Sequence, residues 1–368
     1  MTRLTLLLVV LVMGCAPRAN LVIVPDTANV GSVQRIFVTT SRDYSETTQT
    51  FAGFARGAVR FAQIDVSIPP SHRAGHIALP GRRPPDPANH VLATRMKTYP
   101  GAPDFRSDLS RALRAKGGEA VIYVHGFNNT MADGVFRIAQ LTHDLQGGGL
   151  PMNYAWPSAG NPLGYVYDRD SALYARDGLE EMLQQVTDAG AQEIVMVAHS
   201  MGALVTMETL RQLAIAGNQR VLDRIGGVIL MSPDLDVEVF RSQASRIGAL
   251  PQPFVLFTST RDRALRLSAR LTGRNERLGS LATADDVADL SVTILDVSEF
   301  RDPGQRHFAP ATSPSLLRII SRLAEVDGAF QRGDTGRTGL LPGTVLTVRN
   351  ATQVILSPTT ALSATGTR

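Results

Sequence analysis

The stretch Ile194-Val195-Met196-Val197-Ala198-His199-Ser200-Met201-Gly202 decides the fold of this chain. Its apolar start predicts a buried strand over 194–198, and residues 201–214 predict a helix that follows at once. Ser200 stands at the join, with the small residues Ala198 and Gly202 two positions before and after it. This pattern predicts a sharp strand-to-helix turn that exposes the serine hydroxyl at the carboxyl end of the sheet, over the positive helix N-terminus. The alternative is a serine that only caps an ordinary helix.

Strands and helices alternate along the rest of the chain. Continuous apolar strands separated by helices predict the α/β class, with a parallel sheet covered on both faces. Residues 69–105 are rich in proline and glycine and predict a long irregular segment, either a surface wrap or a lid. The predicted strands are 35–40, 59–68, 120–124, 152–156, 194–198, 227–231, 254–257 and 290–295. The predicted helices are 109–116, 131–145, 171–188, 201–214, 237–247, 264–271 and 313–324, and a tail hairpin is predicted over 345–348 and 354–356.

A second motif follows the strand 120–124. His125-Gly126-Phe127-Asn128-Asn129 resembles the His-Gly loop of esterases and lipases. Together with Ala198–Gly202, it makes residues 119–325 resemble the α/β-hydrolase superfamily, in particular an esterase/lipase-like bacterial branch. The resemblance is also carried by Trp156-Pro157-Ser158, Tyr167-Asp168-Arg169, Ser232-Pro233-Asp234-Leu235-Asp236 and, near the start, Val66-Ser67-Ile68-Pro69-Pro70 with His72.

The resemblance implies an α/β-hydrolase fold, with a mostly parallel central sheet, helices on both faces, extra N-terminal strands and a C-terminal tail. It further implies a serine hydrolase without a cofactor. In that fold the nucleophile is followed along the chain first by an acid and then by a histidine. His307 is the only one of seven histidines that follows Ser200, and it stands just before the predicted last helix. We therefore expect Ser200 as nucleophile and His307 as general base.

Two carboxylates compete for the third position of the triad. In the superfamily the acid usually follows the second strand after the nucleophile strand, which indicates Asp262. Some members place it after the first, which would indicate Asp234. The resemblance therefore favours Asp262 over Asp234. The structural alternative for Asp234, in Ser-Pro-Asp, is a helix N-cap or a first-turn carboxylate.

The oxyanion hole is expected to use backbone amides. Met201 follows the nucleophile, and Phe127 lies in the loop after an earlier strand. Such a donor typically contributes about 3–4 kcal/mol to transition-state binding. His125 is expected to anchor the loop rather than to act as a base. Trp156 follows a strand end, where it either lines the pocket or packs.

The N-terminus reads as a lipoprotein signal. An apolar run over 4–13 follows Arg3 and is too short to span a bilayer. Leu11-Val12-Met13-Gly14-Cys15 resembles the lipobox of bacterial lipoproteins, which implies cleavage before Cys15 and lipidation of that residue. The alternative is an ordinary secretory signal. We expect a signal peptide over 1–14, a tether over 15–32, a hydrolase domain over 33–330 and a tail over 331–368. The expected location is the bacterial cell envelope, facing the periplasm.

Composition excludes other classes of function. The formal net charge is +4 and the arginines are scattered, so nucleic acid is not an expected partner. Cys15 is the only cysteine, and a disulfide within the chain is therefore impossible. His72 and His76 are the histidines with helical spacing, but prolines and a glycine break any helix there, so no metal site is expected. An ester substrate is the default. An amide or thioester substrate, or a non-catalytic envelope lipoprotein that binds a partner, are the alternatives.

Overall fold

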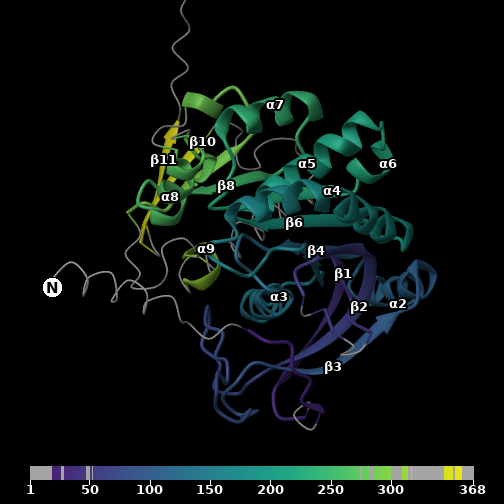
Figure 1. Cartoon of the computed structure of the whole chain (residues 1–368). Coiled ribbons are helices and arrows are strands. Elements are labelled where there is room, and N and C mark those ends of the chain that lie inside the picture. The colour runs from purple at the N-terminus through teal and green to yellow at the C-terminus, as the bar shows by residue number, and fades with distance from the viewer. Residues whose placement is uncertain are drawn as a thin grey trace, which may run out of the picture.

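In the computed structural model, one twisted sheet forms the centre of the molecule (Figure 1). The structure describes residues 19–25, 29–46, 50–51, 53–273, 276–281, 285–299, 309–313, 316, 344–350 and 353–358. Cys15, His307 and most of the expected helix 313–324 lie outside these residues. The strands are β1 (Ser32–Arg42), β2 (Arg56–Ile68), β3 (Leu92–Tyr99), β4 (Glu119–Val124), β5 (Leu150–Ala155), β6 (Glu193–His199), β7 (Ile225–Met231), β8 (Phe254–Thr258), β9 (Thr293–Asp296), β10 (Thr344–Asn350) and β11 (Gln353–Pro358).

Helices connect the parallel strands. They are α2 (Ala102–Ala115), α3 (Met131–Leu145), α4 (Tyr165–Asp188), α5 (Gly202–Ile215), α6 (Gln219–Leu222), α7 (Val237–Ile247), α8 (Arg263–Leu271) and α9 (Ala309–Thr312), with short 3-10 turns η2 (Leu278–Ser280) and η3 (Asp285–Val287). In Figure 1, α3 and α9 lie on the opposite side of the sheet from α4, α5 and α7. None of the helices in the described residues has the length and apolar character needed to cross a bilayer.

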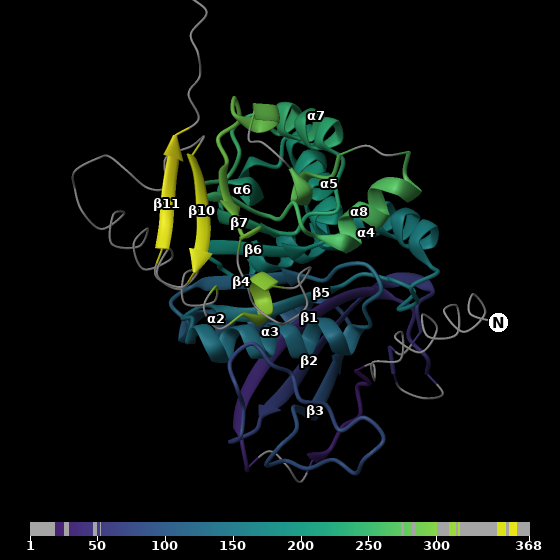
Figure 2. The same cartoon turned by 90° about the vertical axis from the view of Figure 1, so that its left-hand side faces the viewer.

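The eleven strands of the described residues have the order β11-β10-β9-β8-β7-β6-β4-β5-β1-β2-β3. Neighbours from β10 through to β1 pair in parallel, whereas β1–β2, β2–β3 and β10–β11 pair antiparallel. Figure 2 shows β3 and β11 at opposite edges. The expected α/β-hydrolase fold, with added N-terminal strands and a mostly parallel sheet, is confirmed.

Both faces of the sheet are buried. One hydrophobic cluster joins the sheet to α2, α4, α5 and α7, and includes Phe105, Leu179 and Phe240. A second cluster joins the other face to α3, through Val135 and Ile138. Burial on both faces explains why the central strands consist of continuous apolar runs.

Two expectations about the N-terminal region are corrected. Residues 69–105 are not irregular throughout, because β3 occupies 92–99 and pairs with β2. Its sequence alternates charged and apolar residues, as suits an edge strand. The prolines on both sides of it make the whole segment appear irregular from sequence. Residues 19–25 are not a free tether either. Ile23 bridges Ala93 in β3, and Ala19 is buried against the second cluster.

The order of the strands reverses at β4. The chain passes from β4 to β5 on one side and then returns to β6 on the other, so the connections after β4 and β6 leave toward opposite faces. In open α/β sheets, ligands bind outside the carboxyl ends of strands at such a reversal. The loop that begins at His125 and the turn at Ser200 both lie there.

Candidate active site

The turn at Ser200 has the strained geometry that its sequence predicts. Ser200 has φ 53°, in the left-handed region that non-glycine residues seldom adopt. Strand β6 ends at His199 and α5 begins at Gly202, so the chain reverses within two residues. A Cβ on Gly202 would collide with the carbonyl oxygens of Val124 and His125, the latter at 2.5 Å. A small residue at 202 therefore lets α5 start against the end of β4.

Backbone hydrogen bonds hold Ser200 in this conformation. Its N–H donates to the Met231 carbonyl at 3.0 Å, and its own carbonyl accepts from Asp234 at 3.1 Å and from Ala203 at 3.0 Å. The turn is thus fixed by the ends of the neighbouring strand and of its own helix. Ser200 is only 4% exposed, in contrast to the open hydroxyl that the sequence predicts. The loop after β4 and the segment after β7 pack against it and account for the difference.

The loop 125–129 lies directly against the nucleophile turn. A Cβ on Gly126 would stand 2.8 Å from Ser200 Cβ and 2.7 Å from His199 Nδ1. Glycine is needed at 126 because the two segments approach this closely. Phe127, the next residue, packs edge-on against Tyr165, with ring centroids 5.3 Å apart. Gly126, the residue before the expected oxyanion donor, thus lies next to Ser200.

A buried carboxylate on another element fixes this loop. Asp168, in the first turn of α4, accepts hydrogen bonds from the Asn128 N–H at 3.1 Å, the Ser158 hydroxyl at 2.5 Å and the Ala159 N–H at 2.6 Å. Burial raises the pKa of Asp168 above its ordinary value, while these three hydrogen bonds act in the opposite direction. Asn128 has φ 60°, so its backbone is held in a conformation that asparagine tolerates better than most residues.

Arg42 closes the same network from β1. Its guanidinium donates to the carbonyls of Gly53 and Asn129, the latter at 2.8 Å. Burial lowers the pKa of Arg42 to about 10, and the charge of Asp168 opposes that shift. A carboxylate and a guanidinium are thus buried on either side of the loop 125–129. Sequence reasoning noted Asp168 and Ser158 only as parts of a resemblance. The predicted helix begins at 171, so the sequence does not show that Asp168 lies in a first turn.

His125 anchors the loop, as expected. It is fully buried, its ring stacks on Trp156 at 5.1 Å, and its Nδ1 lies 3.0 Å from the Gly126 carbonyl. Burial lowers the pKa of His125 to about 3, so the ring is neutral at physiological pH. Trp156 is buried too, and its indole donates to the His125 carbonyl at 2.6 Å. Of its two expected roles, the structure favours packing.

The two candidate acids have different surroundings. Asp262, after β8, caps α8 by accepting from the Ala264 and Leu265 amides through Oδ1. Asp234, after β7, is enclosed by three other side chains. It accepts from Tyr165 and Ser268 at 3.1 and 2.5 Å and pairs with Arg277, whose Nε lies 3.4 Å away. Asp234 does not cap a helix, the alternative role that its sequence allowed, because Asp236 caps α7.

The arrangement around Asp234 couples it to the nucleophile turn without exposing it. Asp234 is 3% exposed and its N–H donates to the Ser200 carbonyl. The negative charge of Asp234 adds to burial in raising the pKa of Tyr165, which stays protonated and able to donate. Asp234, Tyr165, Ser268 and Arg277 therefore form a buried brace between α4, α8 and the end of β7.

A cavity of about 580 Å³ lies near this brace, over the helices. Ser200 does not line this cavity. The described residues of its wall are mostly charged: Arg169, Glu208, Arg211, Asp236, Glu238, Val239, Ser242, Gln243, Thr272 and Arg277. Cations and anions are mixed in this wall, so it does not select a ligand of one charge. The turn at Ser200 stands elsewhere, at the reversal of the sheet.

The sequence of this region matches a known family. The family model described as an alpha/beta hydrolase of unknown function (DUF900) matches residues 102–323, more than half of the chain. The chain belongs to this family. The match begins at α2, so strands β1–β3 lie outside it. These three strands extend the sheet that the matched region forms. No curated protein gives a significant match.

Several solved structures of hydrolases are distantly similar. A putative YdeN-like hydrolase from Pectobacterium atrosepticum is 19% identical, covering 61% of this chain and 97% of that chain, with a TM-score of 0.34. A thermophilic carboxylesterase from a metagenomic library is 11% identical, covering 81% and 88%, with a TM-score of 0.37. An esterase from Pyrococcus furiosus is 9% identical, covering 84% and 98%, with a TM-score of 0.38. The substrates of these enzymes do not transfer to this chain.

Proposed function

We propose that this chain is a serine hydrolase that cleaves carboxylic esters, with Ser200 as nucleophile, His307 as general base and Asp262 as the acid. One observation carries the proposal. Ser200 has φ 53° at the reversal of the sheet, and the loop of Gly126 packs against its Cβ. A non-glycine residue held in strain at the ligand-binding edge of an α/β sheet is typical of a nucleophile.

In the proposed reaction, Ser200 Oγ attacks the ester carbonyl while His307 takes its proton. The amides of Met201 and Phe127 stabilise the oxyanion. The alcohol leaves with the proton from His307, and an acyl-enzyme remains. Water, deprotonated by His307, then attacks the acyl carbon and releases the acid, and Ser200 recovers its proton.

The surroundings of the two acids support Asp262 over Asp234. Both oxygens of Asp234 already receive hydrogen bonds from buried side chains, so this carboxylate serves the brace. Asp262→Asn should lower kcat by about 10⁴-fold, the effect of losing the acid that orients the imidazole. Asp234→Asn should lower the melting temperature, because it weakens the pair with Arg277. Its effect on kcat should be much smaller than that of Asp262→Asn. The opposite pattern would transfer the acid role to Asp234.

Labelling with a fluorophosphonate tests the nucleophile, since only an activated serine reacts. The native chain should be labelled and should hydrolyse p-nitrophenyl acetate, whose small size suits the low exposure of Ser200. Ser200→Ala should lose both properties and keep its circular dichroism spectrum. Ser232→Ala is a matched control, because Ser232 also follows a parallel strand with positive φ, 47°. Turnover that survives in Ser200→Ala would reject the proposal.

The same experiment addresses the alternatives. Absence of labelling in the folded native chain would favour a non-catalytic protein that binds a partner. Comparison of ester, amide and thioester substrates with the same acyl group would decide which type of bond is cleaved, which the fold does not determine.

The proposed location rests on Cys15 alone. We propose that the mature chain is anchored through lipid at Cys15 in the bacterial cell envelope, facing the periplasm, so that lipid esters are within its reach. Two or more acyl chains would give stable anchoring. Metabolic labelling with a radioactive fatty acid should mark the native chain and not Cys15→Ser, and the variant should leave the membrane fraction. A variant that stays labelled would exclude Cys15 as the site.

A further inference from the structure

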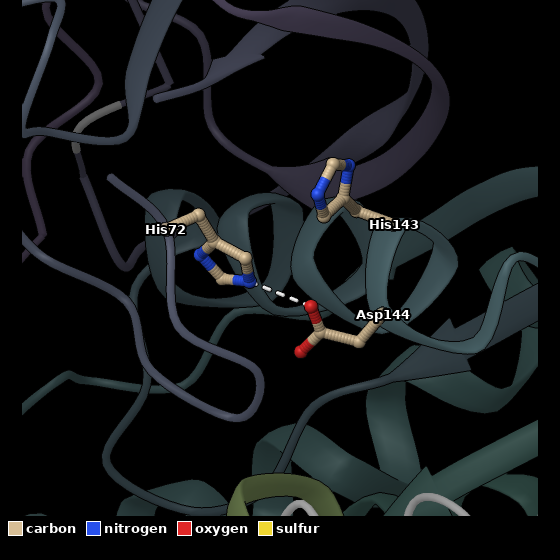
Figure 3. Close-up of side chains that lie close together, drawn as sticks. All are labelled: His72, His143 and Asp144. Atoms are coloured by element: carbon tan, nitrogen blue, oxygen red, sulfur yellow. Dashed lines mark hydrogen bonds and ion pairs between the residues drawn. The ribbon is translucent and has the colours of Figure 1, made fainter. Parts of the chain in front are cut away.

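Three metal-binding side chains meet far from Ser200 in the sequence, where the loop after β2 crosses the end of α3. His72 comes from the loop, and His143 and Asp144 are neighbours in the last turn of α3. One ligand atom from each lies within 4.8 Å of the others. Figure 3 shows the three side chains around one space between the loop and the helix.

The carboxylate of this cluster is buried and fixed in orientation. The side chain of Asp144 is 2% exposed and that of His72 is 8% exposed. Asp144 Oδ2 accepts from the Gly75 N–H at 2.7 Å and from Gln140 at 2.5 Å, so Oδ1 is directed at His72 Nε2, 2.6 Å away. Outer hydrogen bonds of this kind orient carboxylate ligands in metal sites.

The imidazole of His143 is the third member of the cluster. The rings of His72 and His143 stand edge to face, with centroids 5.1 Å apart. The two rings come from separate segments, the loop after β2 and the last turn of α3, and each can offer a ring nitrogen to one ion.

We infer that His72, His143 and Asp144 bind a zinc ion, with water as the fourth ligand. Two imidazoles and one carboxylate suit Zn²⁺, whereas Ca²⁺ and Mg²⁺ prefer oxygen ligands alone. Tetrahedral bonds of about 2.0–2.2 Å place neighbouring ligand atoms about 3.3 Å apart. The contact between His72 and Asp144 would open from 2.6 Å to that distance as the ion replaces the shared proton.

The site would fasten the loop to the hydrolase core. At Gly75 the loop passes so close to Thr312 that a Cβ would collide with its carbonyl oxygen. The ion would hold this loop to α3, and the loop in turn contacts α9. From the sequence no metal site is expected, because the only pair that it suggests, His72 and His76, is not held on one helix. In the structure His76 is exposed, and the partners of His72 come from the distant helix α3.

Zinc binding to the untagged full-length chain, first stripped with a chelator, tests the inference. We expect one tightly bound Zn²⁺ per chain, measured by elemental analysis after dialysis. We also expect four-coordinate Co²⁺ absorption when cobalt is added instead. Saturating Zn²⁺ should raise the melting temperature by about 5 °C.

Variants separate this site from adventitious binding. His143→Gln should lose the bound ion, the cobalt spectrum and the thermal shift, and His72→Gln should do the same. His76→Gln changes an exposed histidine of the same loop and should keep all three. Failure of the native chain to retain zinc, or equal retention by His143→Gln, would overturn the inference. Because the readouts are metal content and stability, they do not depend on the activity of Ser200.

Discussion

At the scale of single residues, the contact of Gly126 with the nucleophile turn is the most sensitive feature of the candidate site. Gly126→Ala would place a methyl group 2.8 Å from Ser200 Cβ, and the loop or the turn would have to shift. A misplacement of about 1 Å can cost 100-fold in rate, so we expect kcat to fall by about that factor. Gly147→Ala is the control, since nothing lies within 4 Å of its added Cβ. Equal kcat values for the two variants would contradict the tight contact.

His125 makes a second prediction at this scale, in the pH dependence of stability. Its folded pKa of about 3 lies below its ordinary value of about 6.5. The stability that depends on neutral His125 is therefore fully present above pH 6.5 and is lost as the pH falls toward 3. The loss is about 1.4 kcal/mol per pH unit, or about 3 kcal/mol by pH 4.

His125→Phe keeps a ring to stack on Trp156 but removes the titrating group. Its free energy of unfolding, measured with urea at several pH values, should fall less steeply than that of the native chain below pH 6.5. Loss of the bond to the Gly126 carbonyl adds a cost of about 1 kcal/mol that does not vary with pH. If the free energies of unfolding of the two proteins fell equally steeply with decreasing pH, burial would not be what holds His125 in its neutral form.

At the scale of elements, α4 positions the loop 125–129 through a single carboxylate. Asp168→Asn keeps the shape of the side chain but weakens its bonds to Asn128 and Ser158. We expect a stability loss of about 1–3 kcal/mol and a fall in kcat larger than any change in KM, since this loop carries the proposed oxyanion donor Phe127. Asp170→Asn, an exposed change two residues along the same helix, should alter neither. A change in KM alone would remove the loop from the proposed mechanism.

The same element shows where sequence reasoning stops. Apolar runs such as 194–198 predict strands well because burial on both faces leaves little choice of residue. The start of α4 was placed six residues late because Tyr165 and Asp168 are polar, and their partners, Asp234 and Ser158, come from other segments. Strand β3 was missed for a related reason. As an edge strand it tolerates charged residues, so its composition differs from that of a buried strand. Its strand conformation depends on pairing with β2, which its own sequence does not reveal.

At the scale of the whole molecule, strands β1–β3 lie outside the family match, and they unfold either together with the hydrolase core or separately from it. The antiparallel strands β2 and β3 extend the sheet through β1, which pairs in parallel with β5. Phe105 of α2 packs against Phe37, Phe61 and Tyr99, so one side chain links this extension to the helix that opens the matched region. We therefore expect the extension and the hydrolase core to unfold together.

The variant Phe105→Ala tests whether the extension and the hydrolase core unfold together. Phe105 is fully buried, and truncation of a buried phenylalanine costs about 3–5 kcal/mol through lost burial and the cavity left behind. Urea unfolding should remain one transition, followed equally by circular dichroism and by Trp156 fluorescence, with its midpoint lowered. Leu163→Ala, at a position 91% exposed, should change the free energy of unfolding by less than about 0.5 kcal/mol. A separate early transition in Phe105→Ala, leaving the fluorescence of buried Trp156 unchanged, would mean that β1–β3 fold as a unit of their own beside the hydrolase core.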